Sequence, residues 1–286
     1  MLAEFDEKAA TGEIAAIFED VRRLWGVPYV SAIHRHLATR PGVLEWAWEA
    51  VGPAFRSGVA QETAWRAVAD VRIAPLAAIP RDALAVWGVD DKGLETVRSI
   101  ADGFVRVAPV NMMFAGLVKA LLEGKAPFAA PSDAHSHPAR GGQVRADAWS
   151  PPTPLPAPPA MVAPDALDAA QRGVLMRFAT ESGGKPFVPG LYRMLAHWPG
   201  LLAHLATVLT PRLDASETHS ACDVVRARID AAVPDVLATL PVVPPKRPMP
   251  SAAERAHFLT IGGTYRKTSP ELIVLGRLIG DAVSVA

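Results

Sequence analysis

Two stretches of this 286-residue chain resemble each other, and this repeat constrains the fold more than any other feature. Residues 26–42 align without a gap on residues 184–200, at a constant offset of 158. The alignment includes the pairs Pro28/Pro186, Arg35/Arg193 and Leu37/Leu195. At an offset of 160, Gly103, Arg106 and Gly116 match Gly263, Arg266 and Gly276. The pattern predicts a tandem duplication of roughly residues 12–124 and 170–283.

The prolines predict where the two repeats are separated. The chain has 27 prolines, and a helical protein tolerates them mainly at helix boundaries. They gather most densely between Pro127 and Pro164, in a stretch that favours extended polyproline conformations. We therefore predict a first helical repeat over 1–125, a proline-rich linker over 126–165 and a second helical repeat over 166–286.

Within each repeat the apolar residues follow a helical period. The first example is the series Ile14, Ile17, Phe18, Val21 and Leu24. No run alternates as a strand would. Near the C-terminus, Ser251 and Glu254 form a capping box, and Ser269 followed by Pro270 predicts the start of the last helix. The expected fold is all-α, with two similar helical bundles packed as a pseudo-dimer.

Composition excludes several classes of protein. The 29 basic and 29 acidic side chains give a net charge of zero, which argues against a nucleic-acid binder. Cys222 is the only cysteine, so neither a disulfide nor a thiolate zinc cluster can form within the chain. The acidic N-terminus and the lack of a long uninterrupted apolar run predict a soluble protein that does not contact membranes. We expect it in the cytoplasm.

Three segments carry a resemblance to a known family. They are residues 28–30, residues 186–189 and residues 107–111, which end at Asn111. In this order, and with the duplication and the linker, they resemble the cofactor-free D,L-2-haloacid dehalogenases of the DehI family, also called halocarboxylic acid dehydrogenases. The resemblance implies an all-α pseudo-dimer that forms a homodimer and has its active site between the two arms. It also implies that water attacks C2 of a small carboxylic acid, with an Asp as base and an Asn that orients the water.

The resemblance assigns roles to individual residues. Asn111 matches the family Asn, although it could equally cap a helix over 112–122. The family Asp falls among Gly190, Leu191 and Tyr192, and no carboxylate lies between Glu181 and Asp214. This chain therefore resembles a divergent member that lacks the expected base. The residues expected around the substrate are Tyr29, Gly190, Leu191, Tyr192 and Tyr265, and for either Tyr192 or Tyr265 a role in core packing is the alternative.

His34 is the leading substitute for the missing base. It lies on the helical face of Val30, Ile33 and Leu37, which should point inward, and an unperturbed imidazole has a pKa of about 6.5. A structural buried histidine is the alternative, and Asp102 and Glu271 are the next acids to consider. Three functions remain open: a dehalogenase-like hydrolase with an altered base, a non-dehalogenating small-molecule protein of the same fold, and a structural helical protein that binds partners.

Overall fold

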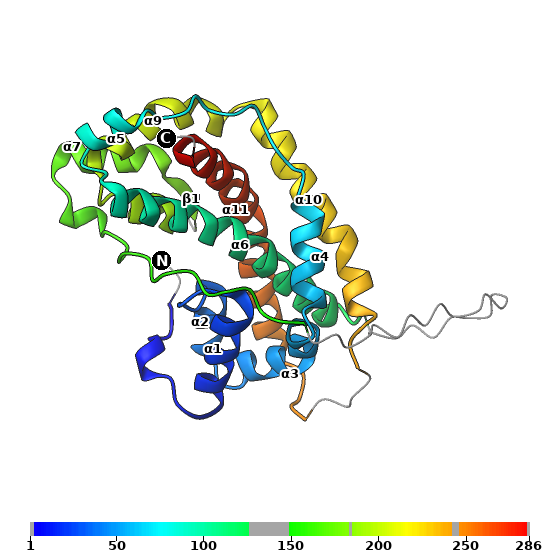
Figure 1. The fold of residues 1–286 in the computed structure, drawn as a ribbon. Coiled ribbons are helices and arrows are strands. Elements are labelled where there is room, and N and C mark those ends of the chain that lie inside the picture. Colours follow the sequence, from blue (N-terminus) through cyan, green and yellow to red (C-terminus); the bar gives the residue numbers. More distant parts are fainter. Residues whose placement is uncertain (1–2, 126–148, 183–184, 242–245, 285–286) are drawn as a thin grey trace.

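A computed structural model describes the chain except for residues 1–2, 126–148, 183–184, 242–245 and 285–286. The described residues are largely helical, so the predicted all-α class is confirmed (Figure 1). The first half contains the short 3₁₀ turn η1 (Glu7–Ala9) and six helices: α1 (Gly12–Trp25), α2 (Ala32–Ala38), α3 (Val43–Arg56), α4 (Val59–Val68), α5 (Arg81–Val86) and α6 (Asp91–Leu122).

The second half has a similar order of short and long helices. Its 3₁₀ turns are η2 (Pro164–Ala166) and η3 (Met176–Phe178), and its helices are α7 (Ala169–Leu175), α8 (Gly190–Leu195), α9 (Pro199–Leu213), α10 (Ser216–Leu237) and α11 (Ala252–Ser284). The helices α2 and α8 begin 158 residues apart, and α6 and α11 begin 161 apart. These spacings agree with the sequence repeat, and the superposition of the two halves stays a prediction.

The long helices α6 and α11 form the centre of the molecule and run antiparallel (Figure 1). Near one end of the pair, the Arg98 guanidinium donates to the Val283 carbonyl at 2.7 Å. Further along, Gly276 lies against Val105 and Ala101, and Gly116 lies close to Arg266. By length and hydropathy α6 could cross a membrane, but most of its apolar stretch is buried in this core. It is therefore read as the core helix of a globular fold.

Several prolines lie inside helices, against the expectation that they mark boundaries. They are Pro53, Pro109, Pro211, Pro234 and Pro270. The predicted start of the last helix at Ser269 and Pro270 is therefore wrong, since α11 continues through both. The alternative role of Asn111 as a helix cap is also excluded, since α6 continues through it. A proline removes one helical hydrogen bond, and the deep burial of both helices outweighs that loss. The capping box at Ser251 does form, since Glu254 Oε2 accepts from the Ser251 amide and hydroxyl at 2.9 Å each.

A small β-hairpin precedes α8, although no strand was expected. Its strands β1 (Thr180–Ser182) and β2 (Lys185–Phe187) pair antiparallel, with Thr180 opposite Phe187. Each strand has only three residues, which is too short to show an alternating pattern in the sequence. The hairpin leaves the all-α class unchanged.

The described part of the predicted linker is residues 149–165, and its residues 149–163 form an extended segment that we call the strap. It passes along the side of α1 and α2 toward α7 (Figure 1). The Trp149 ring packs directly on Gly58, where a Cβ would lie 2.2 Å from the ring. The Leu155 amide donates to the Gly26 carbonyl at 3.0 Å, and the Val162 amide donates to the Arg193 carbonyl at 3.2 Å. The strap thus connects the two halves, while His135 and His137 lie outside the described residues.

Candidate functional site

His34 lies inside a closed aromatic cluster of the first half. Its side chain is fully buried on α2, and its ring centroid is 4.4 Å from that of Phe114 and 5.4 Å from that of Trp25. Neither ring nitrogen has a hydrogen-bond partner among the residues that the structure describes. Burial lowers the pKa of His34 to about 3. The imidazole is therefore neutral at pH 7 and a weaker base than an exposed histidine, which the sequence alone did not indicate.

Asn111 joins the same cluster from the middle of α6. Its Oδ1 accepts a hydrogen bond from Trp25 Nε1 at 2.9 Å, and the side chain is 8% exposed. Because an indole nitrogen can only donate, this contact fixes which end of the amide faces Trp25. The amide nitrogen of Asn111 keeps its two donors for another group. The structure therefore places Asn111 and His34 on the same tryptophan, and it does not support Asn111 as a helix cap.

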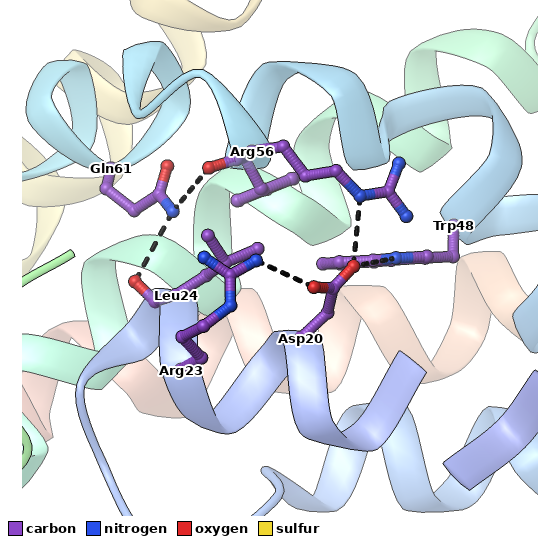
Figure 2. A network of polar contacts seen from close by, with 7 residues as sticks. Asp20, Arg23, Leu24, Trp48, Arg56 and Gln61 are labelled. Carbon is purple, nitrogen blue, oxygen red and sulfur yellow. Dashed lines mark hydrogen bonds and ion pairs between the residues drawn. The ribbon is translucent and has the colours of Figure 1, made fainter. Parts of the chain in front are cut away.

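A polar network on the outer side holds the aromatic cluster in place (Figure 2). The Asp20 carboxylate accepts from Arg23 at 2.8 Å, Arg56 Nε at 2.9 Å and Trp48 Nε1 at 3.3 Å. Partial burial raises the pKa of Asp20, but the hydrogen bonds from Arg23 and Arg56 outweigh it and hold that pKa below its ordinary value. The network fixes Trp48, whose ring is 6.3 Å from that of His34.

The expected base position on α8 is apolar and enclosed. Leu191 is completely buried, and Tyr192 beside it stacks on Phe178 with ring centroids 4.0 Å apart. The Tyr192 hydroxyl is buried and has no hydrogen-bond partner in the described part of the chain, and burial raises its pKa well above its ordinary value. Gly190, at the start of α8, lies against Phe104 of α6. Leu191 offers no atom that could accept a proton.

The other two predicted substrate contacts lie apart from the aromatic cluster. Tyr29 is half-buried, with its hydroxyl close to Gly103 of α6, and burial raises its pKa to about 12 although the charge of Arg106 opposes the rise. Tyr29 and Gly190 thus flank neighbouring residues of α6. Tyr265 on α11 is half-buried, and burial raises its pKa. The charge of Glu4 adds to the rise, and that of Arg35 opposes it. It therefore lies near the N-terminal segment.

Among the acids, Glu271 has the most unusual surroundings. It is half-buried on α11, where burial and the charge of Asp214 raise its pKa while His219 opposes them. Its charge contributes to the raised pKa of Tyr192 and of Cys222, the latter to about 11. A carboxyl group with a raised pKa is one mark of a functional site. The sequence does not show that Glu271 is buried, so it does not indicate the raised pKa. Asp102, the other acid considered, is exposed.

Neither of the two described cavities lies at the aromatic cluster. The larger, of about 310 Å³, lies between α7 and α9 and is lined almost entirely by apolar side chains, including Leu167, Val174 and Leu202. The smaller lies among Trp46, Val118 and Phe258. Among the residues that the structure describes, no three His, Cys, Asp or Glu side chains are grouped as ligands for a metal ion.

Comparison with solved structures places the fold. A D-2-haloacid dehalogenase in complex with a ligand abbreviated L-LA superposes with a TM-score of 0.70 at 18% identity, over 99% of this chain and 96% of that one. A D-2-haloacid dehalogenase mutant in complex with D-2-CPA gives a TM-score of 0.64 at 17% identity, over 99% and 94% of the two chains. No family model and no curated protein matches the sequence. The chain therefore has a haloacid-dehalogenase-like fold.

Proposed function

We propose that the protein is a hydrolase of the 2-haloacid dehalogenase type with low activity. In this proposal a small 2-halocarboxylic acid binds between the two halves, and water attacks C2 as the carbon–halogen bond breaks. The halide leaves, the water loses a proton to a base, and a 2-hydroxy acid forms. The observation that carries the proposal is the pairing of Asn111 with Trp25 beside His34, in a fold that matches solved D-2-haloacid dehalogenases over 99% of its length.

Asn111 would orient the attacking water. Its Oδ1 is held by Trp25, so the amide geometry is set before the substrate arrives. The amide nitrogen can then donate to the water oxygen. Such a role needs a rigid amide, and the ring contacts around Trp25 provide that rigidity. The reaction uses only water and side chains, so it requires no cofactor.

The weak point of the reaction would be proton removal. Leu191 cannot accept a proton, and His34, with a pKa of about 3, is a poor acceptor at neutral pH. Loss of general-base catalysis costs about 10²–10⁴-fold in rate. We therefore expect slow turnover of 2-chloropropionate at best.

A second candidate is a small-acid-binding protein of the same fold that does not dehalogenate. The complete burial of Leu191 and the stacking of Tyr192 on Phe178 favour it, since they fill the expected base position with packed core side chains. Such a protein would retain binding between the halves without an acceptor for the proton of water.

Two measurements separate the candidates. Halide release from racemic 2-chloropropionate tests the hydrolase, and calorimetric binding of propionate, which has no halogen, tests the binding protein. The hydrolase proposal expects slow release that is lost in Asn111→Ala, while circular dichroism shows an intact fold. Saturable propionate binding without any halide release would instead support the second candidate. We also propose a homodimer, for which light scattering should give about twice 30.4 kDa.

A further inference from the structure

Two histidines from opposite halves of the chain meet outside the candidate site. His36 on α2 and His257 on α11 are 221 residues apart in sequence, and their Nε2 atoms are 2.8 Å apart. His36 is 4% exposed, and His257 is partly exposed to solvent. The two imidazoles therefore present their nitrogens to each other at the edge of the contact between α2 and α11.

The surroundings of His36 fix its tautomer. Its Nδ1 lies 2.6 Å from the carbonyl oxygen of Ala3, which can only accept, so Nδ1 carries the proton. In neutral His36 the Nε2 atom then presents a lone pair, and His257 Nε2 donates to it. A histidine whose Nδ1 donates to a backbone carbonyl and whose Nε2 keeps a lone pair has the arrangement typical of metal-ligating histidines.

His257 is suited to the same chemistry. Its Nε2 faces His36 Nε2 at the partly exposed edge of the contact between α2 and α11. Moving its proton from Nε2 to Nδ1 would turn both Nε2 lone pairs toward a shared point. Zinc–nitrogen bonds of about 2.0–2.1 Å at tetrahedral angles need the nitrogens slightly farther apart than 2.8 Å. His257 has room for this shift because it is only partly buried.

We propose that His36 and His257 form a two-histidine site for a divalent transition-metal ion such as Zn²⁺. Imidazole nitrogen is a preferred ligand of Zn²⁺, Cu²⁺ and Ni²⁺. Glu254, one turn before His257, is held by Ser251, so water would take the remaining positions around a bound ion. The positive charge of Arg40 opposes cation binding and limits the affinity. The bound ion would tie α2 to α11 and so stabilise the contact between the two halves.

Calorimetric titration of the untagged, chelator-treated full chain with Zn²⁺ tests the proposal. We expect one Zn²⁺ per chain and a higher melting temperature. In His257→Gln the affinity should fall at least about tenfold, because loss of a ligand costs no less than loss of its supporting hydrogen bond. His36→Gln should do the same, but His36 is buried, so the partly exposed His257 provides the decisive variant if His36→Gln unfolds.

Matched controls exclude the other histidines. His197→Gln changes a histidine that binds the Ala160 carbonyl far along the chain, and a double variant, His135→Gln with His137→Gln, removes the two linker histidines. Both controls should bind Zn²⁺ as the unmodified chain does. The proposal is overturned if the unmodified chain shows no saturable binding, if His257→Gln binds equally well, or if either control abolishes binding.

Discussion

The two halves of the molecule place different chemistry beside the same pair of central helices. In the first half, Asn111 of α6 binds Trp25, and the same indole lies against His34. In the second half, Glu271 of α11 follows Asn111 by 160 residues, and its charge acts on Tyr192, which follows His34 by 158. The first cluster is therefore neutral at pH 7, whereas the second contains a carboxyl group.

In the reaction that we propose, burial separates the two groups that water activation needs. Attack by water needs a group that orients it and a base that takes its proton. The first half holds a fixed amide in Asn111 but encloses its imidazole so completely that the pKa falls to about 3. The second half holds a carboxyl with a raised pKa in Glu271, and this acid, not an amide, lies 160 residues after Asn111. Among the described residues, neither of these two clusters combines both parts, which agrees with the low activity that we propose.

The largest expected effect comes from placing a carboxylate on α8. In Leu191→Asp, the new acid is enclosed, so burial raises its pKa toward the value that suits a base at neutral pH. If the proposed site between the two halves holds a water near Asn111, halide release from 2-chloropropionate should increase by about 10²–10⁴-fold over Leu191→Asn. Leu191→Asn is the matched control because it has the same shape without the carboxylate.

Stability must be followed in both variants, since a polar group at a fully buried position is costly. Urea unfolding will show that both are folded under the assay conditions. Equal halide release from the two folded variants would contradict the assignment of position 191 to the base and would favour a cleft shaped for a different ligand.

The second effect is a pH dependence that originates in the first half. His34 has a pKa of about 3 when folded and about 6.5 when unfolded, so between these values the unfolded chain binds more protons. Stability therefore decreases as the pH falls below about 6.5. At pH 5 the loss is about 2 kcal/mol relative to pH 7. Urea unfolding at both pH values measures it.

Replacement of His34 by a residue that does not titrate should remove this loss. His34→Phe keeps a ring among Trp25 and Phe114 and should lose about 2 kcal/mol less between pH 7 and pH 5. His197→Gln, which alters an exposed histidine, should keep the dependence of the unmodified chain. If His34→Phe loses as much free energy of unfolding between pH 7 and pH 5 as the unmodified chain, groups other than His34 cause the acid sensitivity.

The helical period and the capping chemistry predicted much of the fold. The all-α class follows from residues such as Ile14, Phe18 and Val21, which all face one side of α1, and the capping box at Ser251 forms as expected. The expectation that prolines mark helix boundaries was wrong at Pro109 and Pro270. Tertiary packing stabilises these long buried helices, and the local sequence does not show that packing. The paired positions of Gly58 and Trp149 also depend on contacts distant in sequence.

The candidate site was only partly predictable for the same reason. The inward face of α2 indicated that His34 is buried, but the sequence gives no sign that both ring nitrogens lack partners. The contact between Asn111 and Trp25 spans 86 residues, and that between His36 and His257 spans 221, so no local motif contains either. The residue type and the helical face identify candidate site residues. Their protonation state depends on tertiary contacts that the local sequence does not show.

A smaller effect is expected from the network that supports the first cluster. Asp20→Asn keeps the shape of the side chain but removes the negative charge of the carboxylate that accepts hydrogen bonds from Arg23 and Arg56. We expect a loss of about 1–2 kcal/mol in stability. The near-ultraviolet circular dichroism of the protein should also change, because the Trp48 indole loses a charged partner. Exposed Asp165, changed to Asn, is the control, and equal stability of the two variants would show that the network contributes little.

The smallest effect concerns the second half and has the opposite sign. Burial raises the pKa of Glu271 above its ordinary value, so the folded chain binds more protons than the unfolded chain just above pH 4.5. Stability contributed by this group is present at low pH and is lost as the pH rises through the folded pKa. Glu271→Gln should therefore stabilise the protein at pH 7, by less than the His34 effect because Glu271 is partly exposed and solvent screens its charge. Urea unfolding of Glu271→Gln at pH 7 should give a higher midpoint than the unmodified chain, with the difference shrinking toward pH 4. A lower midpoint at pH 7 would mean that the neighbours of Glu271 stabilise its carboxylate. The contrast between a neutral first cluster and a second cluster that destabilises its carboxylate would then be lost.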